Sequence, residues 1–231
     1  MRQEMFQNTV QIAGARDLNE ARWLEELGVD FIGFPLRLGY HKPDVTEEMA
    51  RTIIAGLEQS NRAVLITYQT SPMEISDFCR FLNVSTVQLH GEISPRAVKQ
   101  LKIERPDLTT IKSLIVRPDF GQDARPLLEL AREYEPWVDA FITDTFDPRT
   151  TACGATGLTH DWSISRLLAS ELIKPLILAG GLHPKNVYAA IKAVRPAAVD
   201  SHTGVEAPGG EKSRELVTRF LSEAKRGFRG E

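Results

Sequence analysis

Glycines and small polar residues follow two apolar runs in the C-terminal third of the chain. Gly180 and Gly181 come after PLILA at 175–179, and the segment SHTG at 201–204 comes after AAVD. An apolar run that ends in glycine or a small polar residue is typical of a parallel strand whose following loop presents backbone N–H groups to an anion. The two segments therefore predict a phosphate site built from the amides and hydroxyls of Gly180, Gly181, Ser201, Thr203 and Gly204.

Two aspartates end apolar runs and are candidate catalytic residues. Asp144 closes VDAFITD and Asp200 closes AAVD, so we expect both carboxyl groups to be partly buried and able to exchange protons. A single aspartate at the end of a strand is as often the cap of the next turn, but two of them favour a catalytic pair. His202 is a third candidate because an imidazole titrates near neutrality.

Four further polar side chains are candidate substrate contacts: Gln88, His90, Lys112 and Arg37. His90 follows VQL and is either a ligand contact or a hydrogen-bonded packing residue, with the packing role favoured. Lys112 lies within an apolar strand, where its ammonium would favour an anionic substrate if it pointed into the site.

The elements that must position these residues alternate along the chain. Short β-rich runs are predicted at 10–13, 31–34, 63–68, 86–89, 110–115, 138–144, 175–180 and 197–200. Amphipathic helices between them begin after typical N-cap residues, namely Asp17, Thr46, Ser71, Ser94 and Asp161. Eight strand–helix units predict a (β/α)8 (TIM) barrel, whose last two strand-to-helix loops are the usual phosphate site. An open doubly wound sheet is the alternative, but no Gly-x-Gly-x-x-Gly follows the first strand.

The composition fits one such barrel and excludes several other classes. The chain has 231 residues with 42% hydrophobic and 26% charged residues, so residues 1–231 are expected to form a single α/β domain with a frayed tail at 227–231. A net charge of −3 without a basic stripe argues against nucleic acid or membrane partners. No apolar run approaches membrane-spanning length, so a cytoplasmic protein is expected. Cys79 and Cys153 lie in no metal-binding pattern, and no metal is expected.

A family resemblance spans nearly the whole chain. VQLHGE, the Lys112 strand, VDAFITD, GATG with the later DW, ILAGGLHPKNV and VDSHTGVE occur in the order found in phosphoribosylanthranilate isomerases of tryptophan biosynthesis. The resemblance implies an Amadori rearrangement of a phosphoribosyl-amine without any cofactor. It implies that Asp144 is the acid that protonates the furanose ring oxygen.

Three positions depart from that family pattern. The family's general base is a cysteine in Lys-Ile-Cys-Gly, and this chain has Gln11 and Ala13 in the corresponding Gln-Ile-Ala-Gly. The loop PLRLGYHKPDV places Pro43 where the family has an arginine, for which Arg37 or Lys42 could substitute. His202 replaces a small residue of the phosphate loop.

These departures leave three hypotheses open. The first is an isomerase of this family, weak or with a substitute base, for which Asp200, His202 and Cys153 are candidates. The second is a paralogue with different chemistry on a related sugar phosphate, and the third is a non-catalytic phosphate binder. A lost general base typically costs about 10² to 10⁴ in rate. A monomer and a homodimer are both compatible with the sequence.

Overall fold

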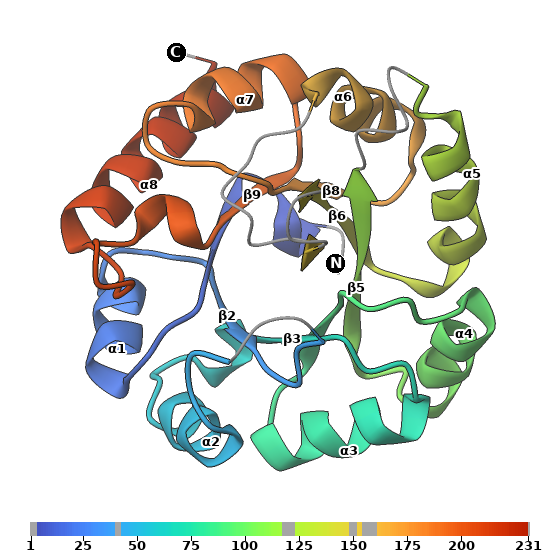
Figure 1. The fold of residues 1–231 in the computed structure, drawn as a ribbon, viewed down its shortest axis with the longest axis horizontal. Helices are drawn as coiled ribbons and strands as arrows, with labels where there is room; N and C mark the ends of the chain where they lie inside the picture. The colour runs from blue at the N-terminus through green and yellow to red at the C-terminus, as the bar shows by residue number, and fades with distance from the viewer. Residues whose placement is uncertain (1–3, 40–42, 117–122, 148–151, 154–160, 231) are drawn as a thin grey trace.

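The computed structural model describes residues 4–39, 43–116, 123–147, 152–153 and 161–230. In these residues strands and helices alternate, and Figure 1 shows the helices in a ring around a central barrel of strands. Eight parallel strands of the described chain pair in the order β1–β2–β3–β4–β5–β6–β8–β9, and β9 pairs back to β1. They are β1 Thr9–Ala13, β2 Phe31–Pro35, β3 Ala63–Thr67, β4 Thr86–Leu89, β5 Thr109–Val116, β6 Ala140–Asp147, β8 Leu176–Leu178 and β9 Ala198–Ser201.

The closed barrel confirms the predicted fold and rules out the open doubly wound sheet. Each predicted strand is present, and the differences are confined to strand ends. One short strand was not predicted: β7, Ala152–Cys153, pairs antiparallel with the end of β6. The eight barrel strands therefore keep their parallel order, and β7 is an addition at the end of β6.

One main helix follows each parallel strand of the barrel in the described chain. They are α1 Leu18–Glu26, α2 Glu47–Ala55, α3 Pro72–Leu82, α4 Pro95–Glu104, α5 Arg125–Tyr134, α6 Trp162–Glu171, α7 Val187–Val194 and α8 Arg214–Arg229. All five predicted N-caps are confirmed, because the side chains of Asp17, Thr46, Ser71, Ser94 and Asp161 each accept a hydrogen bond from a backbone N–H of the first turn. Each such cap stabilises its helix by about 1 kcal/mol.

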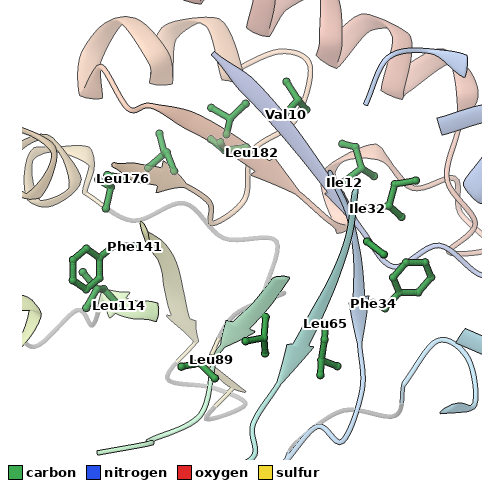
Figure 2. Packing of buried hydrophobic residues seen from close by; sticks show 14 of the residues in the cluster. Val10, Ile12, Ile32, Phe34, Leu65, Leu89, Leu114, Phe141, Leu176 and Leu182 are labelled. Carbon is green, nitrogen blue, oxygen red and sulfur yellow. The ribbon is translucent and has the colours of Figure 1, made fainter. Parts of the chain in front are cut away.

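The apolar core is divided by the barrel wall. Alternate strand residues such as Val10, Ile12 and Ile32 point outward and pack under the helices, as Figure 2 shows. The residues between them point inward, where Ala13, Ile66 and Ile177 belong to a second cluster inside the barrel. Phe6 of the 3-10 helix η1, Glu4–Phe6, joins that inner cluster and is fully buried. This period-2 alternation decides which side chains reach the barrel interior.

The last helix continues to the end of the described chain. Residues 227–229 form its final turn, Gly227 is buried against Ile191, and Gly230 caps the helix with φ +82°. The structure thus gives helix at positions where the sequence predicted a frayed tail. None of the helices in the described parts of the chain is long and apolar enough to cross a membrane.

Candidate active site

A cavity of about 280 Å³ opens at the C-terminal ends of the barrel strands. This is the end of the barrel where the strand-to-helix loops gather. The lining comes from the ends of β1, β2, β3, β4, β6, β8 and β9 and from the loops that follow them. It consists of Ala13, Arg16, Pro35, Leu38, Asp44, Ile66, Tyr68, Gln88, His90, Asp144, Gly180, Gly181, Leu182, Asp200, Ser201, His202, Thr203, Gly204 and Glu206.

The two predicted catalytic carboxylates both lie in this cavity. Asp144 Oδ1 accepts a hydrogen bond of 2.8 Å from the Thr145 N–H, whereas Asp200 Oδ1 is excluded from solvent and has no hydrogen-bond partner within the described structure. Burial and the nearby charge of Asp144 raise the pKa of Asp200 to about 7, against the opposing hydrogen bond from Gln11 and the charge of Lys212. Asp200 can therefore gain and lose a proton near neutral pH.

A chain of polar side chains crosses the barrel floor beneath the cavity. Gln11 Nε2 donates to Gln88 Oε1 at 3.1 Å, and Gln88 Nε2 contacts Ser113 Oγ at 3.4 Å. The same hydroxyl lies 2.9 Å from His90 Nδ1, and the His90 ring lies 4.8 Å from that of Tyr68. Gln88 and His90 thus line the cavity and are also held in place by this chain of hydrogen bonds.

The glycine loops after β8 and β9 are packed against each other. Gly180 and Gly181 have φ of +93° and +62°, which glycine adopts without strain. A Cβ on Gly204 would lie only 1.9 Å from the Leu182 carbonyl oxygen, so the close approach of the two loops requires glycine there. Ser201 Oγ donates to the same carbonyl at 2.7 Å. The hydroxyl of Ser201 therefore joins the two loops.

The remaining members of the predicted phosphate site begin the short 3-10 helix η5, Thr203–Val205. The first N–H groups of a helical turn have no partner within it, so the amides of Thr203 and Gly204 are candidates to bind an anion. Asn186 supports the facing loop, donating from Nδ2 to the Gly181 carbonyl at 3.0 Å and accepting from the His183 N–H at 2.8 Å.

His202 lies between two carboxylates. Its Nε2 is 3.5 Å from Asp44 Oδ2 and 3.4 Å from Glu206 Oε1. Glu206 is held in turn by Lys212, whose Nζ lies 2.6 Å from the same Oε1 and 3.2 Å from the His202 carbonyl. The loop after β2, which carries Asp44, and the loop after β9 thus meet at the imidazole.

Two predicted substrate contacts lie away from the cavity. Lys112 pairs with Leu89 in the sheet, and both face outward; its Nζ donates to the carbonyls of Leu89, Gly91 and Ser113 at 2.8–3.2 Å. Burial lowers the pKa of Lys112 to about 8. The structural reason is its position in the strand, because a residue one place before the inward Ser113 must point outward.

Arg37 is turned away by its neighbours. Its guanidinium donates to Glu47 at 2.8 and 2.9 Å and to Gln69 at 3.2 Å, and it lies 3.8 Å above the Phe78 ring. In the described structure Arg37 and Lys112 therefore make structural contacts outside the cavity lining, and their role as substrate contacts stays a prediction. Lys42 and the side chain of Cys153 lie outside the described residues.

Several lining residues escaped the sequence reasoning. Arg16, Leu38 and Asp44 lie on loops with no motif of their own. Arg16 is the only lysine or arginine among the described lining residues, and its Nη1 donates to the Gly209 carbonyl at 2.9 Å. Glu206 also lines the cavity, and its place in the motif VDSHTGVE was the sequence signal that could have identified it.

Comparisons with known proteins agree with the geometry. A family model described as N-(5'phosphoribosyl)anthranilate (PRA) isomerase matches residues 13–223. An N-(5'-phosphoribosyl)anthranilate isomerase of Methanocella arvoryzae is 35% identical over 94% of this chain and 97% of that protein. A relative from Haloferax volcanii with the same name is 33% identical over 94% of this chain and 92% of its own.

Solved structures give the same result. The crystal structure of phosphoribosyl anthranilate isomerase from Thermotoga maritima has a TM-score of 0.78 at 30% identity, covering 94% of this chain and 98% of that one. A phosphoribosyl anthranilate isomerase in complex with reduced 1-(o-carboxyphenylamino)-1-deoxyribulose 5-phosphate has a TM-score of 0.76 at 29% identity, with the same coverage. With a matching family model, relatives above 30% identity and a shared barrel, this chain belongs to the phosphoribosylanthranilate isomerase family.

Proposed function

We propose that the protein is an isomerase that converts a phosphoribosyl-amine into the corresponding aminodeoxyribulose phosphate, with phosphoribosylanthranilate as its substrate. The observation that carries the proposal is that Asp144 and Asp200 share one cavity with the paired glycine loops after β8 and β9. The relatives' names support the reaction, and the ligand in the solved complex is a reduced aminodeoxyribulose phosphate.

The reaction needs an acid and a base on one substrate. Asp144 donates a proton to the furanose ring oxygen as the C1′–O bond breaks, and the nitrogen lone pair forms the C1′ iminium. A base then removes the proton on C2′, which yields the enol that becomes the ketone. Ala13 offers a methyl group where the family has a thiol, so the base must come from elsewhere in the cavity. Asp200 and His202 are the candidates among the described lining residues.

The two ends of the substrate fit different parts of the lining. The amides of Gly181, Thr203 and Gly204 suit the phosphate, because close-approach backbone N–H groups bind anions. Arg16 is the cation available in the described lining to a second anionic group. Gln88 of β4 and His90, which follows that strand, form another part of the cavity lining. We expect a cytoplasmic enzyme, either a monomer or a homodimer.

Turnover of phosphoribosylanthranilate tests the proposal. Loss of substrate fluorescence is followed in the wild type, Asp144→Asn and Ala13→Cys. The proposal requires wild-type activity that falls by at least about 100-fold in Asp144→Asn, the scale expected for a general acid. Absence of wild-type turnover would refute it. Turnover gained only in Ala13→Cys would then indicate a barrel that has left this reaction for another substrate or a binding role.

A further inference from the structure

The three departures from the family pattern meet at one place in the structure. Gly14 follows Ala13 at the end of β1, and a Cβ built on it would lie 2.3 Å from His202 Nε2 and 2.9 Å from Asp44 Oδ2. The imidazole therefore lies against the backbone directly after Ala13, and Asp44 comes from the altered loop after β2. His202 therefore lies beside the end of β1, where the family places its thiol, and it also lines the cavity.

The surroundings of His202 match those of a base. Its side chain is 20% exposed, that of Asp44 19% and that of Glu206 18%, so the three form a partly buried cluster at the cavity wall. Both carboxylates face Nε2, which places the ring proton on that nitrogen and leaves the lone pair on Nδ1. A carboxylate that holds one ring nitrogen also stabilises the imidazolium that forms when the other takes a proton.

The charges around the cluster keep Asp44 ionised. Burial by itself would raise the pKa of Asp44, but the hydrogen bond and charge of His202, together with Lys212 and Arg16, lower it below its ordinary value. Glu206 is shared between His202 and Lys212. Asp44 is thus the carboxylate that is left to orient the imidazole.

Asp200 is less suited to the same task. Burial and the nearby charge of Asp144 together raise its pKa to about 7, so its protonation is linked to that of Asp144. Its register partner Gln11 belongs to the polar chain of the barrel floor. Asp200 therefore suits proton exchange with Asp144 better than attack on a carbon-bound proton.

We propose that His202 is the general base of the isomerisation and that Asp44 is its positioning residue, replacing the cysteine that the family carries at the position of Ala13. This inference rests on the proposed function. Nδ1 of His202 takes the proton from C2′, the C2′–H electron pair forms the C1′=C2′ bond, and the iminium π electrons return to nitrogen. C1′ then takes up a proton from the imidazolium, and the enol hydroxyl gives one to Asp144, so both residues return to their starting states.

The test compares His202→Gln with the double variant that adds Ala13→Cys. His202→Gln should lower kcat by about 10² to 10⁴ with KM changed less than about threefold, because the base acts in the chemical step. Adding Ala13→Cys should restore kcat at least tenfold, since it returns a proton acceptor to the end of β1. The control is Asp77→Asn on α3, an exposed residue that does not line the cavity and should keep kcat within threefold.

Asp44→Asn provides a readout that a purely structural role would not change. It should lower kcat about tenfold and move the acidic limb of the kcat/KM profile to lower pH, because a neutral amide stabilises the imidazolium less than a carboxylate does. Glu206, Lys212 and Arg16 also face this cluster and remain unchanged in the variant. An unmoved acidic limb would remove Asp44 from the positioning role.

Two results would overturn the assignment of the base. One is a His202→Gln variant whose kcat stays within threefold of the wild type; the other is a loss confined to KM. In both cases wild-type turnover leaves the proposed function intact and transfers the base to Asp200. Failure of the proposed function looks different, because the wild type itself then shows no turnover.

Discussion

Asp200→Asn should make the protein more stable at pH 8 and have little effect on stability near pH 4. The Oδ1 atom of Asp200 is excluded from solvent without a hydrogen-bond partner in the described structure, and burial with the charge of Asp144 raises its pKa to about 7. Ionising this group therefore destabilises the native state. The amide side chain has nearly the same shape and carries no charge at any pH.

The sign and the size follow from the two pKa values. Between about pH 4 and pH 7 the native protein keeps a proton on Asp200 that the unfolded chain has released, so the wild-type free energy of unfolding falls as pH rises through this window. A pKa raised from 3.8 to about 7 corresponds to an upper limit of roughly 4 kcal/mol. Because one side of the carboxyl faces the cavity, we expect about half of this, roughly 2 kcal/mol at pH 8 and under 1 kcal/mol at pH 5.

Thermal and urea unfolding at pH 5, 6, 7 and 8 measure the difference. A gain of about 2 kcal/mol corresponds to a rise in Tm of roughly 4 to 8 °C for a protein of this size. Asp77→Asn is the control, because Asp77 is 64% exposed and forms only a surface ion pair with Arg80. Its effect should be small and independent of pH.

Equal stability differences at pH 5 and pH 8 would refute this reasoning, and so would a variant that is less stable at pH 8. Either result would mean that Asp200 ionises in the native protein as readily as in the unfolded chain. The cavity would then have to stabilise the negative charges of Asp144 and Asp200 at the same time.

Three further predictions concern the loops and the two predicted contacts, Arg37 and Lys112, that lie outside the cavity lining. Gly204→Ala should raise KM at least tenfold, because the new Cβ would force the loop after β9 away from the Leu182 carbonyl. Steady-state kinetics that match the wild type would contradict the close packing of the loops after β8 and β9. Arg16→Ala should raise KM by about tenfold or more, as expected for the loss of a charged contact. Arg37→Ala should leave KM within twofold, because its guanidinium is held by Glu47 outside the cavity lining. A larger KM effect in Arg37→Ala than in Arg16→Ala would support Arg37 as the substrate contact. Lys112→Met should keep KM within twofold but lower Tm, because three backbone carbonyls lose their hydrogen-bond donor. A change in KM without a change in Tm would instead indicate that the Lys112 ammonium lies in the cavity.

Most of the fold could be predicted from the sequence, because it depends on local patterns. Strand-forming apolar runs, N-caps such as Ser71 and Ser94, and loop glycines each act over a few residues. Eight such units have few ways to bury their apolar faces, and the closed barrel is one of them. The places of Asp144, Asp200 and the glycine loops follow at once, since strand ends in a barrel meet on one face.

Tertiary structure decided the direction and the partners of individual side chains. The Lys112 side chain faces the outside of the barrel, because a shift of one residue along a strand exchanges the inside of the barrel for the outside. The Arg37 side chain lies outside the cavity lining, because Glu47 and Phe78, from two different helices, hold its guanidinium.

The same limit applies to the base of the reaction. His202 and Asp44 lie far apart in the chain, yet their side chains meet over Gly14. The sequence by itself determined that Ala13 cannot accept a proton and that acidic and glycine-rich strand ends share one face. Only the folded barrel decided which imidazole and which carboxylate lie beside Ala13, because closing the sheet brings the loops after β1, β2 and β9 together.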